Sequence, residues 1–329
     1  MDILLTSTAH DGFGPLVLGA APGARLLRMQ ADGRIVGDDG EVARDEAKPE
    51  VAWATSDLFD PGAPTRPFFG LAMRSQSLRW LQSSAAGTDA PVFGDLVRRG
   101  VRLTTSHVQS VSIAEHVLRV VLDHYQGAEQ WHEAQRARRW DRRDFREVAG
   151  TRWLVVGLGS IGAEVSVRAR AFGATVTGVR RNPVGDEPVD EMIGPDDVAS
   201  ALPEAEIVVL AAPATAATRH MVDEDFLGRM GPGSVLVNVG RGALVDEEAL
   251  LRALDRGVPD AALLDVFATE PLPADHPLWV HPRVTVTPHA SASGAGRYAR
   301  AADLFAANLE AWVRGEPLRH EVTAADLDR

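Results

Sequence analysis

Three residues in the second half of the chain have side chains suited to chemistry at a carbonyl group. A guanidinium can hold a carboxylate and polarise the adjoining carbonyl, and an imidazolium can protonate the resulting alkoxide. A carboxylate beside the imidazole would keep it oriented and charged. Each of the three follows a predicted strand, and the set consists of Arg241 in the run 238–242, Glu270 in the run 265–271 and His289 in the run 286–290.

The three residues should meet, because ligands of an open α/β sheet bind outside the carboxyl ends of its strands. Together they predict the reduction of a 2-keto acid, provided that a hydride donor binds beside them. Each residue alone has an ordinary explanation. Arg241 could pair with an acid, Glu270 could cap the turn before a proline, and His289 could be a buried histidine with its hydrogen bonds satisfied. Their joint placement at three strand ends favours chemistry.

A glycine-rich turn predicts the source of the hydride. The turn follows a short apolar run, Arg152 to Val156, that suits a buried strand, and it precedes a helical stretch from Ile161 to Phe172. In a dinucleotide fold the first glycine permits the tight turn, the second lets a pyrophosphate approach, and the third allows close helix packing. Such turns also arise by chance, but here the flanking strand and helix favour a nucleotide. The expected phosphate-binding residues are Gly157, Gly159, Ser160, Ile161 and Gly162.

Two arginines predict which dinucleotide binds. The next predicted strand, Ala174 to Val179, ends where such folds usually place an acid on the ribose diol, but this chain continues with Arg180 and Arg181. An acid would repel a 2′-phosphate, whereas a guanidinium offers it planar, bidentate donors. The pair therefore favours NADP(H), with NAD(H) as a weaker cofactor. The alternative is that both arginines only form a solvated loop in an arginine-rich chain.

Length and composition are those of an ordinary soluble protein with two domains. The chain has 329 residues, of which 45% are hydrophobic and 24% charged, and it shows no signal peptide and no apolar run of bilayer length. We therefore expect a cytoplasmic protein without a membrane partner. The net charge of −12 argues against a nucleic-acid partner. The chain lacks cysteine, and His220 has no second ligand at close spacing. His276 and His281 lie in a Pro-rich loop and His132 in a charged segment, so we expect no metal.

Strand and helix patterns alternate along the chain, which predicts the α/β class with doubly wound parallel sheets. A capping-box pattern at 112–115 predicts a long helix that begins at Ser112, and the tail predicts a helix from Arg297 to Arg314. Two more helices, each opening with an acid, are expected at 223–230 and 246–256. The predicted strands are 3–6, 51–55, 78–82, 101–104, 152–156, 174–179, 207–210, 234–239, 261–264 and 284–287.

Together these motifs resemble the signatures of the D-isomer-specific 2-hydroxyacid dehydrogenase family. The glycine turn, the run 238–247, the run 265–273 and Thr287-Pro288-His289 occur in the family's order, and the similarity covers nearly the whole chain. The resemblance implies a flavodoxin-like substrate domain at 1–107 and 292–329 and a Rossmann NAD(P)-binding domain at 108–291. It also implies a cleft between the two domains.

The resemblance also implies roles for individual residues. Arg241 would bind the substrate carboxylate and carbonyl, His289 would be the acid/base, and Glu270 would pair with the histidine. Asp265 would face the nicotinamide carboxamide, and the loop at 84–89 would hold the substrate carboxylate through its backbone amides. The remaining expected contacts are Ala85, Ala86 and Gly87 for the substrate, and Ala212, Pro213 and Val239 for the cofactor.

Departures from the family pattern narrow the predicted function. Arg180 replaces the family's common acid, as in its NADPH-preferring reductases of glyoxylate, hydroxypyruvate and related 2-keto acids. Glu270 is not glutamine, which argues against the formate dehydrogenase branch. We therefore expect an NAD(P)-dependent oxidoreductase that prefers NADP(H) and interconverts a small 2-keto acid and a D-2-hydroxy acid. The alternative is an NAD(H)-sensing or corepressor-like protein of the same fold without turnover.

One segment of the chain resembles the family's dimer segment. It runs from Trp131 to Arg143, between the predicted long helix and the first cofactor strand. The resemblance predicts a homodimer. Alternatively, Trp131 and Trp140 are ordinary core residues.

Overall fold

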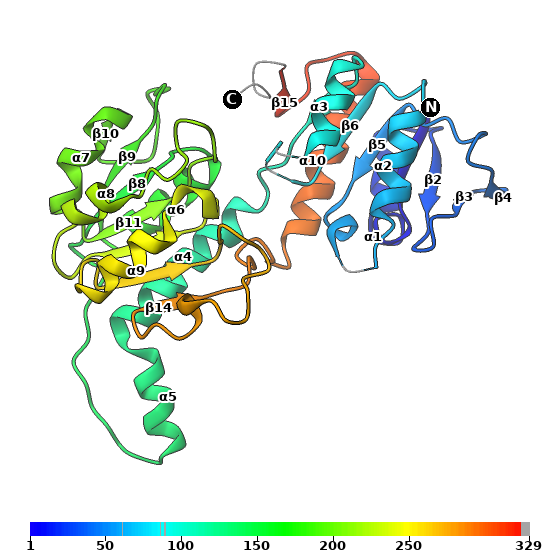
Figure 1. The fold of residues 1–329 in the computed structure, drawn as a ribbon. Helices are drawn as coiled ribbons and strands as arrows, with labels where there is room; N and C mark the ends of the chain where they lie inside the picture. The colour runs from blue at the N-terminus through cyan, green and yellow to red at the C-terminus, as the bar shows by residue number, and fades with distance from the viewer. Residues whose placement is uncertain (61, 86, 89, 324–329) are drawn as a thin grey trace. The chain divides into compact units, whose positions relative to one another are not determined.

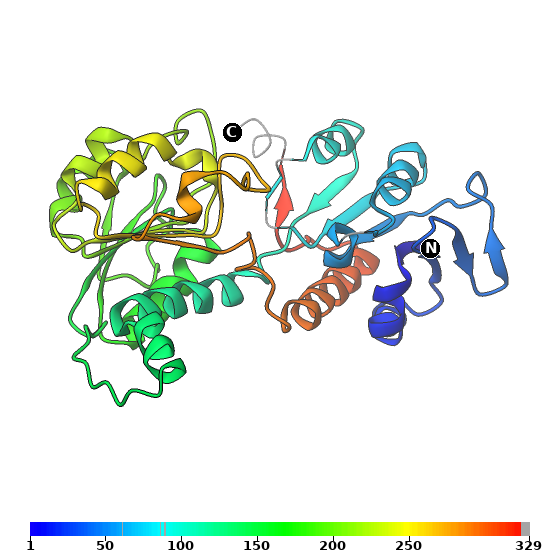
Figure 2. The same cartoon turned by 60° about the horizontal axis from the view of Figure 1, so that its bottom comes forward.

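The computed structural model describes residues 1–323 except 61, 86 and 89, and the chain forms two compact units. The first unit comprises Met1–Val108 and the segment that begins at Ala295, and the second is Gln109–Gly294. Each unit has its own mainly parallel sheet with helices (Figures 1 and 2). The predicted fold class, α/β with two parallel-sheet domains, is confirmed.

The first unit has a sheet in the order β15-β7-β6-β5-β1-β2-β3-β4. The central five strands are parallel, whereas β3, β4 and β15 add antiparallel edges that the sequence analysis missed. It also missed the parallel strand β2. The strands are β1 (Asp2–Thr6), β2 (Arg25–Met29), β3 (Ile35–Gly37), β4 (Gly40–Val42), β5 (Val51–Ala54), β6 (Trp80–Ser83), β7 (Arg102–Thr104) and β15 (Glu321–Val322).

Helices cover both faces of this sheet. One core lies beneath α1 (Ser7–Ala20) and α10 (Arg297–Arg314), and the other lies beneath α2 (Thr65–Arg74) and α3 (Pro91–Arg98). A 3₁₀ turn, η1 (Ser56–Phe59), follows β5. The prediction for α10 is confirmed, since Phe305 on its apolar face stacks on Trp53 at 4.6 Å between ring centroids.

The second unit has an all-parallel sheet in the order β10-β9-β8-β11-β12-β13-β14. The strand order reverses between β8 and β11, and in such sheets ligands bind at the reversal, beyond the carboxyl ends. The short edge strand β10 is the one that the sequence did not predict. The strands are β8 (Arg152–Val156), β9 (Thr175–Val179), β10 (Glu191–Ile193), β11 (Ile207–Leu210), β12 (Val235–Asn238), β13 (Ala261–Leu264) and β14 (Val284–Val286).

Helices also cover both faces of the second sheet. One core lies beneath α4 (Ser110–Gln126) and α6 (Ser160–Ala171), and the other lies beneath α7 (Val198–Ala201), α8 (Glu224–Arg229) and α9 (Glu247–Asp255). The predicted acids are the N-caps of the last two helices: Asp223 accepts from the Phe226 amide, and Asp246 accepts from two amides of α9. The remaining elements are α5 (Ala128–Arg136), η2 (Pro195–Asp197), η3 (Leu202–Glu204), η4 (Gly242–Leu244) and η5 (Pro277–Trp279).

The capping box predicted at 112–115 is wrong. Helix α4 begins two residues earlier, at Ser110, and its N-cap Gln109 makes no side-chain capping bond. The hydroxyl of Ser112 instead donates to the Gln109 carbonyl at 2.9 Å and to the Ala292 carbonyl at 3.4 Å. A serine inside the first turn can bond a carbonyl and so need not cap. Ser112 thus connects α4 to the segment after β14.

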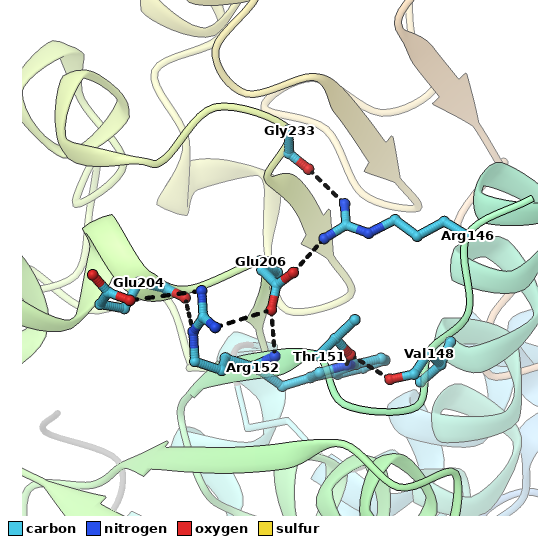
Figure 3. Close-up of polar contacts among 8 residues, drawn as sticks. Arg146, Val148, Thr151, Arg152, Glu204, Glu206 and Gly233 are labelled. Carbon is cyan, nitrogen blue, oxygen red and sulfur yellow. Dashed lines mark hydrogen bonds and ion pairs between the residues drawn. The ribbon is translucent and has the colours of Figure 1, made fainter.

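Ion pairs fix the amino ends of the second sheet (Figure 3). The Arg146 guanidinium donates to the Gly233 carbonyl and pairs with Glu206, and the other Glu206 oxygen accepts from the Arg152 amide at 2.9 Å. These groups lie at the amino ends of β12, β11 and β8, and they join the segment that returns from α5 to the sheet. Such partly exposed pairs contribute about 0–1 kcal/mol each. The contacts at the amino ends of the strands are therefore structural, and the predicted site residues lie at the carboxyl ends.

None of the helices in the described residues is long and apolar enough to cross a membrane.

Candidate active site

The predicted site residues of the second unit follow the carboxyl ends of neighbouring strands. Because these strands are parallel and adjacent, the loops that follow them all lie at the carboxyl end of the sheet. In the order of the sheet, the residues are Arg180 and Arg181 after β9, the glycine turn 157–162 after β8, Ala212 and Pro213 after β11, Val239 and Arg241 after β12, Asp265 and Glu270 after β13, and His289 after β14.

The glycine turn has the geometry that a dinucleotide pyrophosphate requires. Gly157 has φ of +98°, and a Cβ there would lie 2.4 Å from the Ala212 nitrogen. A Cβ on Gly162 would lie 2.5 Å from the Gly157 oxygen, so both glycines are required by packing. The middle residue, Gly159, differs because its Cβ would meet no described atom within 4 Å. The space beside Gly159, at the start of α6, is open to a phosphate.

The first turn of α6 adds backbone donors to this space. Helix α6 begins at Ser160, and its N-cap Gly159 has no side chain to occupy the first amides. An uncapped helix N-terminus favours an anion through its free N–H groups and its dipole. The residues present therefore fit a dinucleotide, whose pyrophosphate the amides of Ser160 and Ile161 would hold.

The two arginines after β9 differ in their surroundings. Arg180 is 36% exposed, and its Nη1 lies 3.4 Å from an oxygen of Glu187. Arg181 is exposed and makes no hydrogen bond or ion pair with any residue that the structure describes. Sequence reasoning missed Glu187, and the one available signal was an acid within the Pro- and Gly-containing loop after the strand. The expected 2′-phosphate site thus contains a carboxylate as well as guanidinium groups.

The imidazole and the carboxylate predicted to act together are in contact. Nδ1 of His289 lies 2.7 Å from Oε2 of Glu270. A carboxylate accepts, so Nδ1 carries the proton of this bond and Nε2 remains to exchange a proton with a substrate. The other oxygen of Glu270 accepts from the Phe267 amide at 3.0 Å, which fixes the carboxylate. His289 is 49% exposed, so its ring can be reached.

Asp265 holds the loop that carries His289. Its side chain is 1% exposed, and Oδ1 accepts from the Thr287 hydroxyl at 2.6 Å and from the Ala290 amide at 2.9 Å. Oδ2 accepts from the Ser291 amide at 3.0 Å. Burial alone would raise the pKa of this carboxyl, but the bonds from Ser291, Thr287 and Ala290 outweigh it and the pKa is lowered. Both oxygens are therefore bonded within the histidine loop, and the contact with nicotinamide stays a prediction.

The Arg241 loop packs directly on the loop that leads to Glu270. Asn238, which is 1% exposed, accepts from the Gly240 amide through its side-chain oxygen and donates to the Arg241 carbonyl, both at 3.1 Å. A Cβ on Gly242 would lie only 1.9 Å from the Phe267 carbonyl carbon. The two backbones approach too closely for any side chain. Arg241 is half-buried at this junction.

A second acid, which sequence reasoning did not select, fixes the same loop. Oε1 of Glu247, the first residue of α9, accepts from the Ala268 amide at 2.8 Å, and Oε2 lies 3.5 Å from Nε2 of His276. Glu247 and Glu270 thus accept from consecutive amides of the loop. These bonds hold the backbone that positions the Glu270 carboxylate.

The loop expected to hold the substrate carboxylate lies in the first unit. After β6, the Ala85 amide donates to the Ser83 hydroxyl at 3.1 Å, and the Ala85 carbonyl accepts from the Ser106 amide at 3.0 Å. Gly87 is half-buried, and Ala86 lies outside the described residues. The Ala85 amide is thus already bonded, and substrate binding by this loop stays a prediction.

No three His, Asp or Glu side chains are grouped so that they could hold a metal ion, within the residues that the structure describes.

The sheet, the glycine turn and the strand-end side chains define an α/β oxidoreductase that binds NAD(P). A family model described as "D-isomer specific 2-hydroxyacid dehydrogenase, NAD binding domain" matches residues 118–291. The chain belongs to the D-isomer specific 2-hydroxyacid dehydrogenase family, and the resemblance noted in its motifs is confirmed.

Curated relatives match part of the chain. Glyoxylate/hydroxypyruvate reductase A of Serratia proteamaculans is 33% identical over 202 residues, which are 61% of this chain and 64% of the relative. D-3-phosphoglycerate dehydrogenase of Methanocaldococcus jannaschii is 31% identical over 260 residues, which are 77% of this chain but only 49% of the relative. The chain thus spans less than two thirds of both of these relatives.

Solved structures match along nearly the whole chain. A D-isomer specific 2-hydroxyacid dehydrogenase family protein from Aeromonas salmonicida is 29% identical with a TM-score of 0.81, covering 98% of this chain and 99% of that one. A D-isomer specific 2-hydroxyacid dehydrogenase from Xanthobacter autotrophicus, solved with NADPH and MES, is 29% identical with a TM-score of 0.76, covering 98% of each chain.

Proposed function

We propose that the protein is an NADP(H)-preferring reductase that converts a small 2-keto acid, such as glyoxylate or hydroxypyruvate, to the D-2-hydroxy acid. The observation that carries the proposal is the 2.7 Å contact between His289, which follows β14, and Glu270, which follows β13. Arg241 follows the neighbouring strand, β12. The NADPH bound to the Xanthobacter protein and the name of the Serratia reductase support the cofactor and the substrate class.

When bound at the glycine turn and the arginines after β9, NADPH would supply the hydride that C2 of the keto acid requires. The Arg241 guanidinium holds the substrate carboxylate and polarises the carbonyl. His289 donates the proton on Nε2 to the new alkoxide oxygen, while Glu270 fixes the ring and stabilises its charged form. We assign the loop after β6 to substrate binding, so the first unit serves as the substrate domain and the second as the cofactor domain. Asp265 is assigned to the nicotinamide carboxamide, and Ala212, Pro213 and Val239 are assigned to cofactor binding.

NADPH oxidation against a panel of keto acids tests the reaction. We expect turnover with at least one of glyoxylate, hydroxypyruvate, pyruvate and phenylpyruvate. The fixed Glu270–His289 pair favours catalysis over the alternative of a nucleotide-sensing protein. Tight cofactor binding without turnover across the panel would support the sensor and contradict the reductase.

The cofactor preference is expected to depend on Arg180. We expect a higher kcat/KM for NADPH than for NADH, because the guanidinium can bind the 2′-phosphate. Arg180→Gln should reduce the ratio of the two values about 10- to 100-fold, because lost charge-assisted bonds contribute about 1.5–3 kcal/mol. A matched control is Arg229→Gln, which removes an exposed arginine paired with Asp225 on α8. A clear NADH preference in the wild type would refute the assignment.

We also propose a homodimer formed through α5 and the segment after it, which extend from the second unit as an arm (Figure 1). Trp140 in this arm is 95% exposed and Phe145 is 48% exposed, so the idea that Trp140 is a core residue is wrong. Trp131, by contrast, is half-buried and packs edge-on against Phe145 at 5.9 Å.

Sedimentation of the wild type should give the mass of a dimer, and Trp140→Glu should shift it toward the monomer, because a buried charge opposes association. The matched control is Val280→Glu, which changes a residue that is 84% exposed in another loop. A monomeric wild type at micromolar concentration would contradict the dimer. We further propose a cytoplasmic location, which cell fractionation would test.

A further inference from the structure

A carboxylate occupies the position next to the guanidinium that we assign to the 2′-phosphate. Oε1 of Glu187 lies 3.4 Å from Nη1 of Arg180. The two residues belong to the same loop region, since Arg180 follows β9 and Glu187 precedes β10. This pair stands where most dinucleotide folds place a single acid at the end of the second strand.

Backbone donors fix the carboxylate in this position. Oε1 of Glu187 accepts from the Val184 amide at 2.6 Å, and Oε2 accepts from the Gly185 amide at 2.8 Å. The side chain is 7% exposed although its loop is exposed. The bonds from Val184 and Gly185 also hold the pKa of Glu187 below its usual value, so it stays charged at neutral pH. Leaving the position would break two bonds of the loop.

The fixed charge of Glu187 affects the binding of NADP(H) but not that of NAD(H). A 2′-phosphate bound to Arg180 would lie within several ångströms of the Glu187 carboxylate, and the like charges would repel each other. The ribose hydroxyl of NAD(H) carries no charge and would not be repelled. Arg181 has no such counter-charge among the described residues, so it supplies attraction that Glu187 does not offset directly.

We propose that Glu187 is a specificity-determining residue that limits the preference for NADP(H) and so keeps NAD(H) usable. The inference rests on the proposed function, because it assumes that the 2′-phosphate binds at Arg180. In this site the fixed carboxylate of Glu187 opposes part of the attraction that Arg180 and Arg181 exert on the 2′-phosphate.

Calorimetric titration of the full-length protein with two cofactor fragments tests the proposal without any turnover. The fragments are adenosine 2′,5′-bisphosphate, which has the 2′-phosphate, and 5′-AMP, which lacks it. Glu187→Gln should tighten binding of the bisphosphate about 3- to 30-fold, because one like charge near a partly exposed site is removed. Binding of 5′-AMP should change less than twofold. Asp186→Asn is the matched control, since it removes an adjacent exposed carboxylate that makes no bond with any described residue.

The outcomes separate this inference from the proposed function. Equal binding of both fragments by the wild type and by Arg180→Gln would refute the 2′-phosphate site itself. A wild type that prefers the bisphosphate, together with an unchanged or weaker preference in Glu187→Gln, would overturn the role of Glu187 alone. Glu187→Gln could lose 5′-AMP binding because its loop collapses. In that case Glu187→Asp tests the role of the charge. It keeps the charge but withdraws it by one methylene, and it should raise the preference in the same direction, whereas no rise overturns the proposal.

Discussion

His289→Gln is expected to lower kcat for the best keto acid by about 10²- to 10⁴-fold, the usual contribution of a general acid. Glutamine keeps a polar side chain of similar length but has no proton that it can donate and regain near neutral pH. Cofactor affinity should stay close to that of the wild type. His289 follows β14 at the edge of the sheet, whereas the glycine turn follows β8, and three strands lie between them.

Steady-state kinetics and a cofactor titration on the same preparation measure both quantities. The matched control is His281→Gln, because His281 pairs with Asp255 at 3.5 Å and accepts from the Arg283 amide, away from Glu270. It should leave kcat within about twofold, because His281 is bonded to Asp255 and Arg283 and makes no hydrogen bond or ion pair with Glu270 or His289 in the described part of the chain. Turnover of His289→Gln near the wild-type value would eliminate His289 as the acid, and with it the proposed reaction.

Part of the site could be predicted because ligands of a parallel α/β sheet bind beyond the carboxyl ends of its strands. Arg241, Glu270 and His289 each came after an apolar run, so their loops had to lie at one edge once the strands were parallel. The same rule located the glycine turn and the arginines. In the fold it identified most of the buried strands but missed β2. It also missed β3, β4, β10 and β15, which are short and lie at or near sheet edges. A two- or three-residue strand has no periodicity to recognise.

The partners that fix the site could not be predicted, because they are acids whose role depends on which backbone amides they meet. Glu247 belongs to the predicted helix start, but its bond to the Ala268 amide depends on the packing of α9 against a loop 21 residues away. Glu187 seemed an ordinary loop acid until the amides of Val184 and Gly185 were placed around it. Asp265 was selected only through the family resemblance, which gave it a different role.

Asp265→Asn should lower the free energy of unfolding by about 2–4 kcal/mol, the cost of disrupting charged hydrogen bonds in a buried site. The asparagine oxygen could still accept from Thr287 and Ala290. Its NH₂ group would then face the Ser291 amide, so two donors would meet.

The wild-type pKa of Asp265 is lowered, so its contribution to stability is present above the unfolded-state pKa of about 3.9 and is lost as the pH falls below it. The variant should show less of this acid-side loss in denaturant titrations.

The same variant distinguishes two roles for Asp265. If the carboxylate positions His289 through the loop at 287–291, kcat should fall about 10- to 100-fold with little change in the Kd of the cofactor, because small displacements of reacting groups are costly. If it binds the nicotinamide carboxamide, the Kd should rise as well. Thr287→Val is the matched control, since it removes one donor at 2.6 Å and leaves the charge in place, and it should give a smaller loss of kcat. Unchanged kcat with a weaker Kd would show that Asp265 acts on the cofactor rather than on the histidine loop. The four bonds between Asp265 and this loop, including the one from the His289 amide to its backbone oxygen at 2.8 Å, favour the positioning role.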